Sequence, residues 1–132
     1  IESIFDIALR RLSIENTNMP PDQSGDISED VPTKTERTVL ESLSEKPHAE
    51  IFDQRQPRVV KLTLDADERV PAHQHPAKNI VLYLLSGTLE LRLGDNNHEL
   101  QSGEAIRFDG NQDIEPQAID SCVALLVLAE KE

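Results

Sequence analysis

The sequence predicts an all-β protein: a barrel of antiparallel strands behind a short helical N-terminal extension. From about residue 47 onward, short runs of β-forming apolar residues recur every few positions and are separated by Gly, Asn and Asp turns. Many short strands joined by tight turns are typical of a closed barrel or sandwich. Before residue 47 the apolar spacing is helical. We therefore divide the chain into an extension over residues 1–46, with a flexible acidic, proline-containing linker at 14–33, and a barrel over 47–132.

Two helices are expected in the extension. Residues 1–13 place apolar side chains at helical spacing, which predicts a short amphipathic helix whose apolar face packs on the barrel or on a second subunit. Thr33 and Glu36 have the spacing of a capping box. The apolar residues behind them predict a second short helix, which ends before Pro47: Val39, Leu40 and Leu43.

The strands are expected at short, regular intervals. Asp65–Glu68 is a polar turn that leads into a strand carrying two histidines, and Ser86-Gly87 interrupts the apolar run that follows. Alternating or continuous apolar residues place the other strands at Ala49–Phe52, Arg58–Leu64, Ile80–Leu85, Thr88–Leu93, His98–Leu100, Ala105–Phe108, Asp113–Ile119 and Cys122–Leu128.

Composition and net charge limit the kinds of partner that we expect for this protein. The chain has 132 residues, which suits one domain, and a formal net charge of −12 from 25 acidic and 13 basic residues. No basic footprint is available to neutralise phosphate, so we expect neither a nucleic acid nor an anionic membrane as a partner. The single cysteine, Cys122, lies in an apolar strand and is expected to be a small core residue. No signal peptide or long apolar run is present in the sequence, and the expected location is cytoplasmic.

The stretch over residues 69–93 holds the candidate site. His73 and His75 are two positions apart, so on a strand both side chains leave the same face. The strand leads into a buried hairpin, and we interpret the two imidazoles as part of the lining of a small pocket inside the barrel. His48 lies near the end of a predicted helix and is expected to be exposed.

The apolar run after the histidines has two apolar faces. Ile80, Leu82 and Leu84 alternate with an equally apolar outer set, Val81, Tyr83 and Leu85. A strand that is apolar on both faces has to be covered on both. We therefore expect a homodimer formed through this sheet face.

The same stretch resembles the first motif of a small single-domain cupin of the RmlC-like β-barrel family, and the likeness extends over about residues 57–130. His73, His75 and the segment Leu84-Leu85-Ser86-Gly87 match that motif, whereas Asp67 stands where the family has a leading glycine. Gly103 matches the start of the second motif. The resemblance implies a double-stranded β-helix, or jelly-roll, barrel.

The resemblance also implies a degenerate metal site. Metal-binding cupins hold iron, manganese, nickel or zinc with three histidines and one carboxylate. Here only His73 and His75 remain, because Ile80 stands at the glutamate position and Ile114 at the position of the third histidine. Two imidazoles are fewer than stable sites for these metals use. We expect no resident cofactor and an apolar pocket, with a divalent transition metal as the alternative; the expected lining is Ile80, Leu82, Ile106, Phe108 and Ile114.

The sequence can also be aligned with the second motif of the family in another register. If the turn after Phe108 is one residue shorter than in the family, Gly110 takes the motif glycine position and Asp113 the ligand position. His73, His75 and Asp113 would then form the two-histidine, one-carboxylate set of non-haem iron oxygenases. The strand phase shared by Ile106, Phe108 and Ile114 favours the longer turn.

Three hypotheses about function follow. The first is a protein that binds a small apolar or weakly polar molecule in the barrel and is not a metal-dependent enzyme of the usual cupin type. The alternative is a metal-dependent oxygenase or isomerase that uses His73, His75 and Asp113. An interaction module acting through the N-terminal helices is a third reading. The residues do not name a ligand, because one fold serves many functions.

Overall fold

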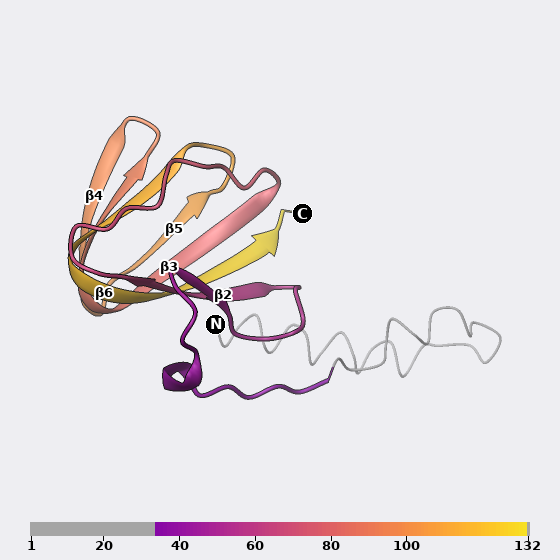
Figure 1. Ribbon diagram of the computed structural model, residues 1–132. Coiled ribbons are helices and arrows are strands. Elements are labelled where there is room, and N and C mark those ends of the chain that lie inside the picture. Colours follow the sequence, from indigo (N-terminus) through magenta and orange to yellow (C-terminus); the bar gives the residue numbers. More distant parts are fainter. Residues whose placement is uncertain (1–33, 132) are drawn as a thin grey trace. The chain divides into compact units, whose positions relative to one another are not determined.

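The computed structural model describes residues 34–131, and strands are the main regular elements of the compact unit that starts at Arg37 (Figure 1). One turn of 3₁₀ helix, η1 (Leu40–Ser42), precedes them. The strands are β1 (His48–Glu50), β2 (Arg58–Leu64), β3 (Lys78–Leu93), β4 (Asn96–Gln101), β5 (Ala105–Asp109) and β6 (Ile114–Glu130). All their pairings are antiparallel, so the predicted all-β antiparallel class is confirmed.

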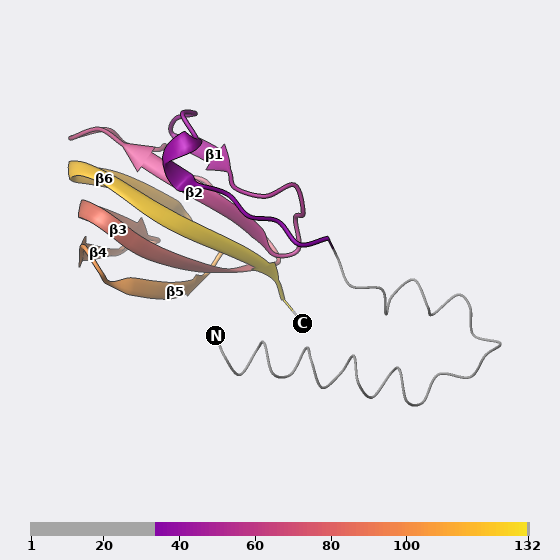
Figure 2. The same ribbon diagram turned by 90° about the horizontal axis from the view of Figure 1, so that it is seen from below.

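Two long strands are shared by both halves of the barrel. The sheet order is β1-β2-β6-β3-β4, and β5 pairs with β3 beside this path (Figure 2). The first half of β3 pairs with β5 and with the second half of β6. The second half of β3 pairs with β4 and with the first half of β6. The sheet therefore bends along β3 and β6 and wraps around its own apolar face, as a jelly-roll barrel requires.

Gly87 marks the bend in β3. The register of β3 against β6 shifts between Leu84 and Leu89, and Gly87 has a φ of +86°. A Cβ at this position would lie 2.1 Å from the main-chain oxygen of Ser121 on β6, so only glycine allows the two strands to approach this closely. The predicted hairpin at Ser86-Gly87 is therefore wrong. The chain turns a barrel corner through an irregularity in one continuous strand, and β6 likewise runs unbroken where two strands were expected.

The core follows the alternation seen in the sequence. Ile80, Leu82 and Leu84 are at most 2% exposed, whereas Val81 and Tyr83 between them are 38% and 39% exposed. Within residues 34–131 every buried side chain is apolar. Cys122 is buried as predicted, and burial raises the pKa of its thiol.

The second predicted helix is reduced to η1, a correction to the capping-box prediction. Val39 precedes η1 with no side-chain cap and is 68% exposed, so a longer helix here would bury little apolar surface. Lys61 Nζ from β2 donates to the carbonyls of Leu40 (2.8 Å) and Leu43 (3.1 Å), which takes the place of further helical hydrogen bonds. The helix predicted over 1–13, the linker and Thr33 lie outside the described residues. No helix in the described part of the chain has the length and apolar character to span a bilayer.

Candidate functional site

A cavity of about 400 Å³ lies inside the barrel. Thirteen of its seventeen lining residues are apolar, and none of the seventeen is acidic. The apolar ones come from β2, β3, β5, β6 and the segment between β2 and β3: Val60, Leu62, Val70, Pro71, Ala72, Ile80, Leu82, Leu91, Phe108, Ile114, Pro116, Leu126 and Leu128. The four polar ones are His48, Arg58, His73 and His75.

The structure brings together most of the predicted lining. Ile80, Leu82, Phe108 and Ile114 all line the cavity, together with His73 and His75. Ile106 does not. It lies opposite Leu82 on β5, an edge strand, where it is only partly buried and packs against the core.

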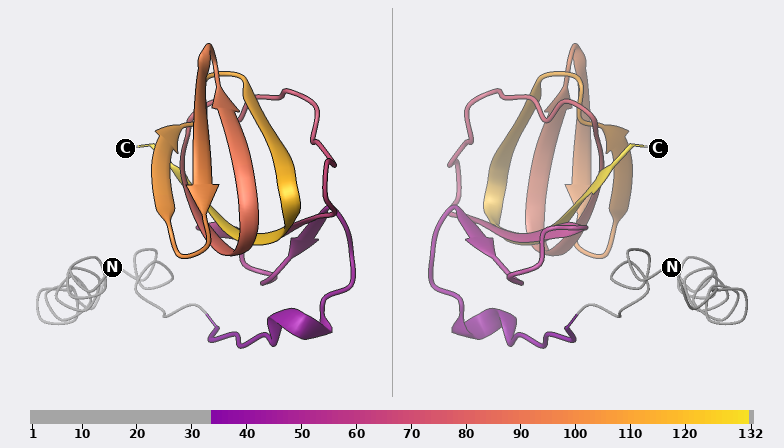
Figure 3. Two further views of the ribbon diagram at one scale, coloured as in Figure 1. Left: turned by 90° about the vertical axis from the view of Figure 1, so that its left-hand side faces the viewer. Right: turned by 90° about the vertical axis from the view of Figure 1, so that its right-hand side faces the viewer.

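The segment over residues 65–77 closes the barrel beside β6 and carries the two histidines (Figure 3). His73 N donates to Ile114 O (3.1 Å) and Ile114 N donates to His73 O (2.8 Å). These contacts are isolated bridges, so the regular strand predicted here is absent. Pro71 and Pro76 lack the N–H groups that a longer ladder needs. Both imidazoles nevertheless reach the cavity, because the segment runs extended across the start of β6.

Two non-glycine residues near the ends of this segment have a left-handed backbone conformation. Asp67 has a φ of +70° and Ala77 a φ of +64°. Asp67 occupies the position where the resemblance expects glycine, and aspartate is one of the few side chains that tolerate this conformation. Asp67 can therefore adopt this left-handed conformation in the place of a glycine.

Gly110 positions His75, a role that sequence reasoning missed. His75 N donates to Gly110 O at 2.8 Å, and Gly110 N donates to Lys78 O at 2.9 Å. A Cβ on Gly110 would lie 2.4 Å from His75 O, so any side chain here would push the histidine segment outward. The Asp-Gly-Asn-Gln sequence predicts a turn that contains this glycine, but it does not show which residue packs on the glycine.

The two histidines pack edge to face. Their ring centroids are 4.9 Å apart and the ring planes meet at 89°. His73 Nδ1 lies 3.0 Å from Pro71 O, which favours the tautomer that donates from Nδ1 and leaves the Nε2 lone pair free. Burial lowers the pKa of His75, and the positive charges of His73 and Arg58 lower it further.

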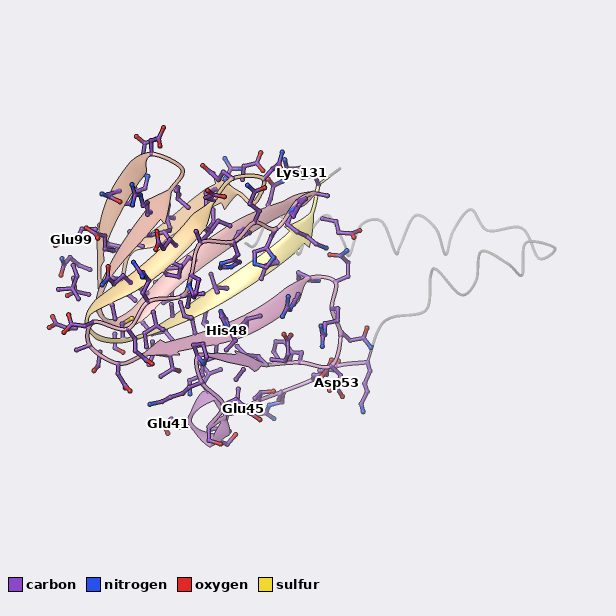
Figure 4. The ribbon with its side chains drawn as sticks, turned by 45° about the horizontal axis from the view of Figure 1, so that its top comes forward. Glu41, Glu45, His48, Asp53, Glu99 and Lys131 are labelled. Atoms are coloured by element: carbon purple, nitrogen blue, oxygen red, sulfur yellow. The ribbon has the colours of Figure 1, made fainter. Side chains whose placement is uncertain are left out.

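His48 and Arg58 complete the polar lining, and sequence reasoning assigned neither to the site. His48 is exposed, as expected, but it also lines the cavity from β1 (Figure 4). Partial desolvation lowers the pKa of His48, and the charges of His73 and Arg58 lower it further, whereas the charge of Glu50 raises it. Arg58 opens β2, next to β1 in the sheet. No local pattern reveals this grouping, because it depends on the pairing of β1 with β2.

Glu50 holds Arg58 in place. Arg58 Nε donates to Glu50 Oε2 at 2.8 Å, and Arg58 Nη2 donates to the same oxygen. This hydrogen bonding lowers the pKa of Glu50 and raises that of Arg58. Glu50 itself is not among the cavity-lining residues.

The residues present do not fit the four-ligand metal set of the family. Ile80 and Ile114, at the positions of the missing ligands, are 2% and 5% exposed and line the cavity. Asp113 is exposed, and its Oδ1 accepts a hydrogen bond from Gln74 Nε2 at 2.9 Å, so the structure does not bring this carboxylate together with the histidines. Within residues 34–131 no three His, Cys, Asp or Glu side chains form a group suited to a metal ion.

Comparisons with known proteins agree with this architecture. A family model for the cupin domain matches residues 60–126, slightly more than half of the chain. None of the curated proteins compared with the chain matches it. Among solved structures, the protein TT1209 from Thermus thermophilus superposes with a TM-score of 0.63 at 19% identity, covering 74% of this chain and all of that one.

Two other solved structures show how varied the neighbours are. A predicted oxalate decarboxylase from Thermotoga maritima has a TM-score of 0.58 at 14% identity, covering 64% of this chain and 79% of that one. An HTH_3 family transcriptional regulator from Vibrio cholerae has a TM-score of 0.52 at 22% identity, covering 57% of this chain. The chain spans only 43% of the regulator's length. At these identities the likeness concerns the fold alone. The chain belongs to the cupin family.

Proposed function

We propose that this cupin binds a small, largely apolar molecule in its barrel. The observation that carries the proposal is the cavity itself, which has a volume of about 400 Å³ and thirteen apolar lining residues. Ligand pockets have volumes of roughly 300–1,000 Å³ and combine mostly apolar walls with a few polar groups. The isoleucines at the two lost ligand positions, Ile80 and Ile114, enlarge the apolar wall and support binding over metal-dependent catalysis.

Filling the cavity tests this proposal. The Ile114→Phe variant adds volume where the side chain lines the cavity, and Val81→Phe adds volume on the exposed outer face. Thermal denaturation with and without octanol measures binding, because a ligand of the folded state raises Tm. We expect octanol to stabilise the wild type and the Val81→Phe variant but not Ile114→Phe. An equal shift in all three proteins would place binding outside the barrel.

One observation favours the rival, a metal-dependent oxygenase or isomerase. The contact between His73 Nδ1 and Pro71 O leaves Nε2 as the free nitrogen, and a carbonyl partner of this kind commonly orients metal-ligating histidines. Metal analysis of protein purified without chelator would separate the two functions. Stoichiometric metal that is lost in the His73→Ala/His75→Ala double variant would favour the enzyme.

The outer sheet face supports a homodimer. Val81 and Tyr83 on β3 lie opposite Val127 and Leu125 on β6, and Val59 on β2 also pairs with Val127. Apolar residues thus continue across three neighbouring strands, and an exposed patch of this kind commonly marks an interface. Sedimentation velocity at micromolar concentration tests the dimer, with Tyr83→Lys as the disrupting variant. A wild-type protein that sediments only as a monomer would contradict it.

A further inference from the structure

The polar lining of the cavity has one chemical character. His48, Arg58, His73 and His75 are all basic side chains, and no acidic side chain lines the cavity with them. The chain as a whole has the opposite balance, with 25 acidic residues against 13 Lys and Arg. A concentration of basic groups on one apolar cavity is therefore a local feature that runs against the composition of the protein.

These four residues act on one another. All four line the same cavity, and the ring centroids of His73 and His75 are 4.9 Å apart. Burial lowers the pKa values of His48 and His75, and the charges of His73 and Arg58 lower them further. They come from three separate parts of the chain: β1, the start of β2 and the segment that precedes β3. The fold therefore assembles them around a common space.

Arg58 retains donors for a ligand. Two of its N–H groups donate to Glu50, and a guanidinium carries three more in the same plane. Glu50 fixes the orientation of the guanidinium and also competes with an anionic ligand for its N–H groups. An arginine that a neighbour holds at the wall of a largely apolar cavity is well suited to bind a planar anion.

We propose that the ligand is a monocarboxylate with an apolar tail, whose carboxylate contacts Arg58 and the neighbouring imidazoles while its tail fills the apolar part of the barrel. This inference rests on the proposed function and deepens it. A carboxylate leaves water only where hydrogen-bond donors replace its hydration. The guanidinium of Arg58 and the neutral imidazoles of His48 and His75 supply such N–H groups, whereas the Nδ1–H of His73 already contacts Pro71 O. A dicarboxylate would place its second charge among the apolar residues and is excluded on the same ground.

Calorimetric titration near neutral pH with octanoate and with octanol tests the carboxylate against an uncharged head of equal chain length. We expect octanoate to bind at least about tenfold more tightly than octanol, the factor that a charge-assisted hydrogen bond supplies. The Arg58→Gln variant should lose this preference. Its matched control is Arg69→Gln, because Arg69 forms an ion pair with Glu115 (3.4 Å) and does not line this cavity.

Glu50→Gln provides a second variant that remains informative if Arg58→Gln does not fold. Neutralising Glu50 leaves Arg58 without its competing anion, so octanoate should bind more tightly, whereas a merely structural role of the pair predicts weaker binding. Equal affinities for octanoate and octanol would overturn this inference and leave the proposed function standing. Absence of binding by both would overturn both. A preference for octanoate that survives Arg58→Gln, or octanoate binding that weakens in Glu50→Gln, would also contradict it.

Discussion

Replacing Gly87 by alanine tests the close approach of β3 to β6 at the barrel corner. The backbone at Gly87 has a φ of +86°, and an added Cβ would lie 2.1 Å from Ser121 O and 2.7 Å from Cys122 Cβ. The oxygen belongs to the main chain and cannot rotate away, so β3 and β6 would have to separate at the barrel corner. Gly103 is a matched control, because its φ is +95° and no heavy atom beyond its own and those of its two chain neighbours lies within 4 Å of the position of a Cβ.

The two substitutions differ in one physical effect. Placing alanine in the left-handed region costs roughly 1–2 kcal/mol at either site. Overpacking in a close-packed interior adds roughly 1–3 kcal/mol, and only Gly87→Ala incurs it. We therefore expect Gly103→Ala to lose about 1–2 kcal/mol of unfolding free energy and Gly87→Ala about 2–5 kcal/mol, a large share of the roughly 5–15 kcal/mol that stabilises a typical domain.

Urea denaturation followed by far-ultraviolet circular dichroism measures both losses. The free energy of unfolding comes from the midpoint and slope of each transition, and an unchanged slope shows that the unfolded state is comparable. If the two variants lose the same free energy, the contact between Gly87 and β6 does not limit the fold. The bend in β3 would then not depend on the absence of a side chain at residue 87.

Three further predictions concern the site. Burial lowers the pKa values of His48 and His75 below the ordinary value of 6.5. Just below pH 6.5 the unfolded chain therefore binds more protons than the folded protein. The free energy of unfolding should accordingly fall as the pH drops below 6.5. Urea midpoints at about pH 7.5 and 5.5 should differ less in the His48→Asn/His75→Asn variant than in the wild type. Ala77→Gly relieves a φ of +64° and should raise the unfolding free energy by about 0.5–1 kcal/mol in the same assay; no gain would show that the segment is unstrained. Ile114→His adds an imidazole across the bridge from His73, so Zn²⁺ should raise the Tm of this variant more than that of the wild type. Equal Zn²⁺ shifts would show that the position does not complete a site.

Much of the barrel could be predicted because strand periodicity is local. β2 (Arg58–Leu64) has the bounds that its alternation indicates. Ile80 and Leu82 point inward and Val81 and Tyr83 outward because successive side chains on a strand face opposite ways wherever the strand lies. The same alternation placed Ile114 inside and left Asp113 outside. These features need no knowledge of distant residues.

The grouping at the cavity required the folded structure. His48 and Arg58 are ten positions apart in the sequence, and both precede the segment that carries His73 and His75. These residues reach the same cavity only because β1 pairs with β2 and because residues 65–77 close onto β6. Gly110 likewise looked like an ordinary turn residue until His75 was seen to pack on it.

Local sequence patterns are sufficient to indicate an antiparallel β-barrel with two histidines beside an apolar run, and the family resemblance shows that two of its metal-ligand positions are isoleucine here. The barrel and the position of the histidines follow from residue type and from a period of two along the chain, whereas the two isoleucine positions follow from the resemblance to the cupin motifs. The tertiary structure alone decided that Gly87 bends one strand where a turn was expected, and that basic residues from three segments line one cavity. Such features depend on which distant main-chain segments approach each other, and that approach is set by the packing of the whole barrel.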